Sequence, residues 1–326
     1  MKVLASAPGK VILCGEHAVV FSEPAIVMAI NKRAFVSAEL RSDNAVYISS
    51  TDLNLSGCFT EEAFKSEVKE SEAAAKLRPI WVAVKKTLEL SNKNLGVNVF
   101  VHSVIPPSIG LGSSAAVAVA TVAAVGRATG IRVSKKEICS VAHEAEKVVH
   151  GQPSGIDTSI STYGGVIAFR RDEGFVPLKT HTRISIIIGN TKIERSTGDL
   201  VRHVRKLREL YPNVINLLIH AIGHVSVMAA EALRKGNLSQ LGNLMNINHG
   251  LLVAIGVSNE NLDRLVAVAR EAGALGAKLT GAGGGGCMIA LTTSGKAKLI
   301  AKAISEAGGD SMIIRGSAGG VRTWVA

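Results

Sequence analysis

A glycine-rich turn followed by small apolar residues is the first stretch of the sequence that could bind a phosphate group. Residues 106–128 read PPSIGLGSSAAVAVATVAAVGRA. Glycines adopt backbone angles that are closed to other residues and allow a ligand to approach the backbone closely. We expect Ser113 or Ser114 to cap a helix that begins here, and the N-terminus of a helix offers unpaired N–H groups and partial positive charge to an anion. The stretch therefore predicts a polyphosphate-binding loop, while a tight turn before a buried helix stays open as the other interpretation.

Two glycine patterns match the dinucleotide-binding fingerprint only formally. Residues 110–115 and 281–286 fit G-x-G-x-x-G/A, a motif that needs a strand before it, a helix after it and an acid about 20 residues on. Two prolines precede the first pattern and its acid is missing, because 130–134 reads GIRVS; the strand-like CMIALTT follows the second. No G-x-x-x-x-G-K-[ST] occurs in the sequence. The context therefore argues against a dinucleotide-binding motif, and a P-loop is absent from the sequence.

Length and composition indicate a folded protein of two domains. The chain has 326 residues, 47% of them hydrophobic and 19% charged, which is long for one core and typical of a globular protein. The formal net charge of +11 fits nucleic acid, a membrane surface or a phosphorylated metabolite as partner. The densest basic cluster has helical spacing and no aromatic platform or nucleic-acid motif beside it, so we expect a solvated helix face and no nucleic-acid partner; its members are Arg202, Arg205, Lys206 and Arg208.

Cysteine usage and the apolar pattern predict a cytoplasmic protein. The four cysteines are far apart and form no CxxC pair, which is typical of reduced thiols and not of a disulfide framework or zinc site. The first ten residues, MKVLASAPGK, contain no apolar core of signal-peptide length. Uninterrupted apolar stretches fall short of the about 18 residues of a membrane span. We therefore expect no membrane partner.

Hydrophobic periodicity predicts alternating strands and helices without a regular parallel βαβ series. Residues 2–8 and 10–15 resemble short strands broken by Pro8-Gly9, and Pro79 should begin or bend the helix predicted over 72–90. Ser134 with Glu137 forms a capping-box pattern before a helix over 134–149. Further helices are predicted over 198–210, 213–235, 237–249, 258–272 and 295–307. We interpret the chain as two α+β domains that meet near residue 180.

Three stretches in this order resemble the signature motifs of the GHMP kinases, the galactose, homoserine, mevalonate and phosphomevalonate kinase superfamily. They are PGKVILCGEHAVV at 8–20, PPSIGLGSSAA at 106–116 and KLTGAGGGG at 278–286. Within the superfamily, GEHAVV, HGQPSGIDTSISTYGG at 150–165 and NTKIERSTGDLV at 190–201 resemble the mevalonate kinases most. The combination is specific although each stretch alone is weak, and it spans nearly the whole chain.

The resemblance implies a two-domain fold and a reaction. Residues 1–180 are expected to form a GHMP kinase N-terminal domain, similar to the second domain of a small ribosomal protein, which holds ATP, Mg²⁺ and the catalytic residues. Residues 181–326 are expected to form a ferredoxin-like C-terminal domain, with ATP and substrate between the two. The implied reaction is ATP-dependent phosphorylation of (R)-mevalonate on its 5-hydroxyl to give 5-phosphomevalonate, a step of isoprenoid precursor synthesis. A homodimer is the expected assembly.

The resemblance also assigns the catalytic and metal-binding residues. Asp157, which could otherwise be a turn residue in its Gly/Pro/Ser loop, is implied to take the proton of the substrate hydroxyl. Lys10, otherwise a surface lysine, is implied to hold that hydroxyl and lower its pKa. Ser114 and Glu146 are implied to bind Mg²⁺, and an oxygen pair of this kind suits that ion.

Binding residues follow from the same motifs. Contacts to ATP are expected from Pro107, Ser108, Ile109, Gly110, Leu111, Gly112, Ser113, Ser114, Ala115 and Ala116. Contacts to the substrate are expected from Lys10, Glu16, His17, Asp157, Arg195, Thr197, Gly281 and Ala282. Three other hypotheses stay open: another GHMP small-molecule kinase such as phosphomevalonate kinase, a non-catalytic ligand-binding relative, and a nucleic-acid-binding protein.

Overall fold

The computed structural model contains two β-sheets with helices packed against them. It describes the whole chain except residues 61–62, 67–69, 94, 108, 152, 181, 195, 294 and 317–318 and the side chains of 149 and 150. The larger sheet runs β13-β1-β2-β6-β3-β4-β5, and β7 pairs with β2 and with β8. Its strands are β1 (Lys2–Cys14), β2 (Ala25–Leu40), β3 (Val46–Ser50), β4 (Leu55–Phe59), β5 (Phe64–Lys65), β6 (Val97–Ser103), β7 (Val166–Arg170), β8 (Gly174–Leu178) and β13 (Arg322–Val325). The smaller sheet runs β10-β11-β9-β12, from β9 (Ser185–Asn190), β10 (Gly276–Leu279), β11 (Cys287–Thr292) and β12 (Asp310–Arg315).

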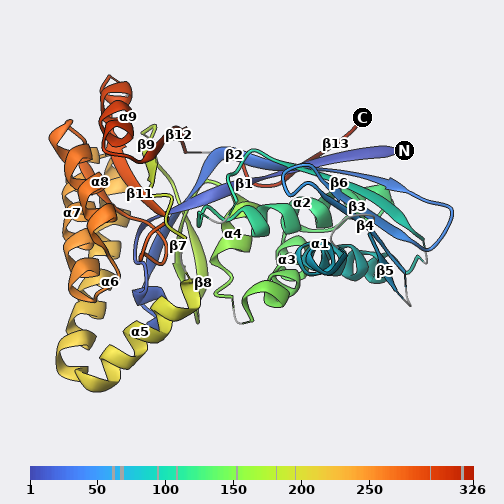
Figure 1. The fold of residues 1–326 in the computed structure, drawn as a ribbon, viewed down its shortest axis with the longest axis horizontal. Coiled ribbons are helices and arrows are strands. Elements are labelled where there is room, and N and C mark those ends of the chain that lie inside the picture. The colour runs from blue at the N-terminus through green and yellow to red at the C-terminus, as the bar shows by residue number, and fades with distance from the viewer. Residues whose placement is uncertain are drawn as a thin grey trace.

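The first four α-helices gather along the larger sheet (Figure 1). They are α1 (Glu70–Ser91), α2 (Ser113–Ala128), α3 (Lys135–His150) and α4 (Ile156–Tyr163). The helix α2 packs on β1 and β2 and also contacts α1 and α3. Its Ala and Val side chains are almost all buried, since small residues let the helix pack closely against neighbours on every side.

The remaining helices form the other end of the molecule (Figure 1). They are the short 3₁₀ helix η1 (Ala18–Phe21), then α5 (Thr197–Leu210), α6 (Pro212–Lys235), α7 (Leu238–Ala254), α8 (Glu260–Glu271) and α9 (Ala297–Glu306). Within the described residues, α6 alone is long and apolar enough to cross a membrane. Its buried residues Ile215, Ile219, Ile222 and Val225 recur every three or four positions, the pattern of a core helix that faces the protein on one side.

The structure corrects two local predictions, excludes one of the two alternatives for a third and confirms a fourth. The break expected at Pro8-Gly9 is wrong, because β1 continues through it with a register shift between Pro8 and Lys10. Of the two roles predicted for Pro79, beginning the helix is excluded, because α1 begins at Glu70 and contains the proline. The capping box is confirmed, since Ser134 Oγ accepts from the Glu137 N–H at 3.3 Å and Glu137 Oε2 from the Ser134 N–H at 2.8 Å. A serine cap on α2 is also wrong, as described below.

The last strand returns to the beginning of the chain. Residues 2–178 contribute to the larger sheet and 185–315 to the smaller one, but β13 pairs antiparallel with β1, with Val325 opposite Val3. The main apolar core includes residues of both sheets, such as Val36 and Ile188. A domain division near 180 stays a prediction, and the closing strand lies on the N-terminal side of it.

Candidate active site

A lysine and an aspartate form the centre of the candidate site. Lys10 Nζ lies 3.2 Å from Asp157 Oδ1. Lys10 is on β1, directly after the register shift, and Asp157 is in the first turn of α4. The lysine side chain is 7% exposed and the aspartate 37%. The pair is therefore accessible mainly from the side of the carboxylate.

The first glycine loop lies against this pair. Gly112 has a φ of +74°, and a Cβ at this position would lie 3.0 Å from Cγ of Lys10 and 3.6 Å from Oδ2 of Asp157. The backbone is bound there as well, because the Lys10 N–H donates to the Leu111 carbonyl at 2.8 Å. A side chain at 112 would need both left-handed backbone and space that the pair occupies. The sequence therefore places glycine where the loop touches the two charged residues.

The N-terminus of α2 begins at the same point. Its N-cap is Gly112, and no side chain of the described residues caps it. The prediction that Ser113 or Ser114 caps this helix is wrong: Ser113 Oγ lies 3.3 Å from Ser103 Oγ, and Ser114 bonds elsewhere. Because the first N–H groups of a helix have no intrahelical acceptor, this end is an electropositive site for an anion.

A serine hydroxyl and a buried carboxylate lie together in the first turn of α2 and on α3. Ser114 Oγ donates to Glu146 Oε1 at 2.5 Å, and Glu146 is almost fully buried on α3. The described residues contain no group of three or more His, Cys, Asp or Glu side chains that could hold a metal. A hydroxyl and one carboxylate are oxygen donors of the kind that fits Mg²⁺, which accepts few protein oxygens and completes its shell with water and phosphate.

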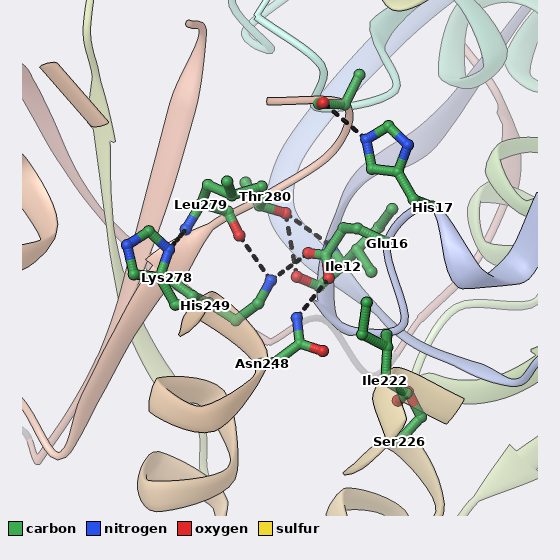
Figure 2. A network of polar contacts seen from close by, with 11 residues as sticks. Ile12, Glu16, His17, Ile222, Ser226, Asn248, His249, Lys278, Leu279 and Thr280 are labelled. Carbon is green, nitrogen blue, oxygen red and sulfur yellow. Dashed lines mark hydrogen bonds and ion pairs between the residues drawn. The ribbon is translucent and has the colours of Figure 1, made fainter. Parts of the chain in front are cut away.

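The segment after β1 turns sharply and is bound by the third glycine-rich motif (Figure 2). His17 Nε2 lies 2.8 Å from the carbonyl oxygen of Ala282, which accepts the N–H. Glu16 is paired with Lys278 through Oε1, and its Oε2 accepts from Asn248 Nδ2 at 3.1 Å. Both predicted residues are buried. The structure thus joins the first and third motifs directly.

A threonine makes a second link between these motifs. Thr280 Oγ1 donates to the Ile12 carbonyl at 3.0 Å and accepts from the Ile12 N–H at 3.1 Å (Figure 2). Ile12 is two residues beyond Lys10 on the same strand. The position of Lys10 is consequently fixed by Leu111 on one side and, through β1, by Thr280 on the other.

Other predicted residues lie at varying distance from this centre. Thr197 is exposed at the start of α5, and no contact of the described residues connects it to Lys10 or Asp157. Gly281 follows Thr280 directly, while Pro107 and Gly110 are exposed, Ile109 is half-buried, and Ala115 and Ala116 are fully buried in α2. Arg195 and Ser108 lie outside the described residues.

Sequence reasoning missed three residues of this region, namely Lys278, Thr280 and Asn248. Lys278 is fully buried on β10, and the signal for it was a lysine three residues before the glycine loop that begins at Gly281. A buried lysine requires a carboxylate partner, but the partner, Glu16, is 262 positions away. The sequence contains both charges without indicating that they pair.

The chemistry of the centre suits transfer of a phosphoryl group to an alcohol. Such transfer requires a carboxylate that accepts the hydroxyl proton, positive charge beside the reacting oxygens, and groups that bind the phosphates in a fixed position. Groups of these kinds are present around Gly112, namely Asp157, Lys10, the α2 N-terminus and the Ser114–Glu146 pair.

The family comparisons agree with the geometry. Residues 78–165 match the family model of the GHMP kinases N terminal domain, and 229–310 match that of the GHMP kinases C terminal domain. A mevalonate kinase of Pyrococcus horikoshii is 44% identical, over 98% of this chain and 97% of the relative; one of Aeropyrum pernix is 37% identical over 90% and 89%.

Solved structures give the same result. The L. major mevalonate kinase in complex with R-mevalonate matches with a TM-score of 0.83 at 30% identity, over 96% of this chain and 95% of that one. The Methanococcus jannaschii mevalonate kinase matches with a TM-score of 0.82 at 28% identity, over 96% and 98%. The prediction of a two-domain GHMP kinase fold is confirmed. This chain belongs to the GHMP kinase family, in which it is similar to mevalonate kinases over nearly its whole length.

Proposed function

We propose that this protein transfers the γ-phosphate of ATP to the 5-hydroxyl of (R)-mevalonate, which yields 5-phosphomevalonate and ADP. The observation that carries the proposal is the Lys10–Asp157 pair at 3.2 Å, which touches Gly112 at the N-terminus of α2. The similarity to mevalonate kinases, one of them solved with R-mevalonate, supports the choice of substrate. This reaction needs a base, a positive charge and a phosphate-binding site close together.

Asp157 is the proposed base. Its carboxylate accepts the proton of the 5-hydroxyl as that oxygen forms a bond to the γ-phosphorus, and the bond from phosphorus to the β-γ bridging oxygen breaks to release ADP. Lys10 lies beside the same carboxylate, so its ammonium group stabilises the negative charge on the attacking oxygen. Because phosphoryl transfer depends mainly on position and charge, a modest base in contact with a lysine is sufficient.

Ser114 and Glu146 are the proposed protein ligands of Mg²⁺. Their oxygens lie together beside the α2 N-terminus, where the triphosphate of ATP would be bound by backbone N–H groups of the glycine loop and the first turn of α2. When bound, the ion neutralises charge on the phosphate oxygens. Glu146 is buried, which orients its carboxylate toward the serine hydroxyl.

The substrate side is proposed to include His17, Thr197, Arg195 and the backbone at Gly281 and Ala282. His17 is held by Ala282, so its ring has a fixed orientation. A guanidinium at 195 would suit the carboxylate of mevalonate. A homodimer in the cytoplasm is the proposed state of the protein.

The test is an assay of the purified protein with Mg·ATP and a panel of alcohols, namely (R)-mevalonate, 5-phosphomevalonate, homoserine and galactose. We expect ADP release with mevalonate to exceed that with every other alcohol by at least about a hundredfold in kcat/KM. Preference for another alcohol would replace the proposed substrate. Absence of turnover with all four, together with salt-dependent retention on nucleic acid, would refute the kinase proposal.

A further inference from the structure

Alternate residues of the third glycine-rich motif bind the segment that follows Lys10. Lys278, Thr280 and Ala282 are spaced two apart, so that in extended chain the first two side chains point to one face. Lys278 pairs with Glu16, Thr280 bonds the backbone of Ile12, and the Ala282 carbonyl accepts from His17. Figure 2 shows these contacts in one network between the two parts of the chain. The segment 12–17 is therefore held along its length by 278–282.

Glu16 has a donor on each of its oxygens. Lys278 binds Oε1, and Asn248 Nδ2 donates to Oε2 at 3.1 Å. Lys278 also donates to the Leu279 carbonyl at 2.6 Å. The side chains of Lys278 and Glu16 are 0% and 1% exposed. The negative charge of Glu16 is thus neutralised inside the protein and does not face the Lys10–Asp157 centre as an open acceptor.

The backbone between β1 and η1 needs such support. Gly15 has a φ of +101°, and a Cβ there would lie 2.4 Å from the Cα of Ala25. His17 has a φ of +59° although it is not glycine. Residues in this region of φ persist only where their surroundings hold them. The contacts of Glu16 on one side of His17 and of Ala282 on its ring provide that support.

We infer that Lys278, together with Asn248, is a positioning residue for the reaction, and that Glu16 acts through this pairing and does not bind the substrate itself. The inference rests on the proposed function for its readout. Lys278 neutralises a carboxylate next to His17, where an unpaired negative charge would repel the carboxylate of mevalonate. It also fixes the turn that carries His17. Asn248 orients the second oxygen of Glu16 and so completes the pairing.

The inference and a direct substrate contact by Glu16 predict different results for the double variant Lys278→Met/Glu16→Gln, in which neither side chain is charged. Lys278→Met alone leaves a buried carboxylate without a counter-charge, and Glu16→Gln alone leaves a buried ammonium unpaired. Breaking a buried pair on one side is more harmful than removing both charges. In the double variant, the glutamine side chain would keep the shape of the glutamate and accept from Asn248. A contact to the substrate carboxylate or hydroxyl would instead stay lost.

The experiment compares wild type, Lys278→Met, Glu16→Gln and the double variant in steady-state kinetics and thermal unfolding. We expect Lys278→Met to raise KM for mevalonate by about tenfold or more and KM for ATP by less than about threefold, since uniform loss of binding would show in KM. The double variant should recover most of the loss in KM and in unfolding midpoint. If Lys278→Met does not fold, the double variant against Glu16→Gln decides the question.

A double variant that is as impaired in KM for mevalonate as its worse single parent would overturn the inference, and so would a Lys278→Met enzyme with wild-type kinetics. The matched control is the exposed pair of Lys302 and Glu306 on α9, 3.5 Å apart, changed to Met and Gln, which should alter neither KM nor midpoint. Failure of wild type to phosphorylate mevalonate would refute the proposed function alone, because the unfolding midpoints of the four proteins still test the pairing.

Discussion

The lysine–carboxylate pairs Lys10–Asp157 and Lys278–Glu16 differ in burial and in the number of partners that each carboxylate has. In the Lys10–Asp157 pair the groups are 3.2 Å apart and the aspartate is 37% exposed. In the Lys278–Glu16 pair both side chains are fully buried, and Asn248 occupies the second carboxylate oxygen. A partly open pair can exchange its partner for a substrate hydroxyl, whereas a saturated buried pair holds the backbone. A lysine paired with a carboxylate thus serves the proposed catalysis at one place and positions the backbone at the other.

Asp157→Asn gives the largest expected effect on the open pair. Asparagine keeps the shape but cannot accept the hydroxyl proton, so kcat should fall by roughly 10²- to 10⁴-fold, the usual contribution of a general base. Because the side chain is partly exposed, the unfolding midpoint should stay close to that of wild type. Steady-state assays and calorimetry measure both; a near-wild-type kcat would remove Asp157 from the mechanism.

Lys10→Met should have the next largest effect. Loss of the ammonium removes the charge beside Asp157 and the attacking oxygen, so we expect kcat to fall about 10- to 100-fold. Lys302→Met, on the solvated face of α9, is the control. An unchanged kcat in Lys10→Met would show that the Lys10 ammonium group takes no part in the transfer.

His249, which bonds the residue after Lys278, should make the stability of the region around the buried pair depend on pH. Burial and, next, the Arg270 guanidinium lower the pKa of His249 to about 4. Its Nδ1 accepts from the Leu279 N–H at 3.4 Å, which requires the neutral ring. The unfolded chain has an ordinary histidine pKa near 6.5, so stability from this group is complete above that pH and is lost as the pH falls toward 4.

Between pH 6.5 and pH 4, the free energy of unfolding should fall by up to roughly 3 kcal/mol because of His249. Urea unfolding at a series of pH values measures it. In His249→Asn, whose side-chain oxygen can accept from Leu279, the dependence should flatten, whereas the exposed His203→Asn control should retain it. A variant with the wild-type slope would exclude His249 as the source.

Thr280→Val should give the smallest effect, on stability and binding together. It removes the donor and the acceptor that meet Ile12, which leaves two backbone groups unpaired at a cost of about 1–3 kcal/mol. KM for mevalonate should rise with it, because the end of β1 loosens. Thr292→Val is the matched control, a buried strand threonine whose hydroxyl donates to the adjacent Thr293 carbonyl at 2.9 Å; an equal rise in KM there would contradict a special role of Thr280.

The sequence predicted the elements better than the contacts between them. Periodicity indicated the helices, and three motifs indicated the family, because both signals lie within short segments. The continuity of β1 through Pro8-Gly9 was not visible, since those residues usually end a strand; the partners that stabilise the irregular strand, Leu111 and Thr280, are far away in sequence.

The site shows the same division. The family motifs indicated Lys10, Asp157, Ser114 and Glu146, and the structure brings each pair together. The serine cap of α2 was predicted from residue preference, but Ser114 bonds Glu146, so tertiary contacts override the local preference. The partner of Glu16 could not be predicted, because nothing in a local pattern states which of 37 lysines and arginines it meets.

A single-turnover measurement tests the contrast between the pairs most directly. The enzyme is in excess over labelled ATP, the (R)-mevalonate is saturating, and the rate of phosphate transfer is measured. The three proteins compared are wild type, Asp157→Asn and the Glu16→Gln/Lys278→Met double variant. We predict that the transfer rate falls at least about a hundredfold in Asp157→Asn and stays within about tenfold of wild type in the double variant. Near-wild-type transfer by Asp157→Asn, or a greater loss in the double variant, would contradict the account.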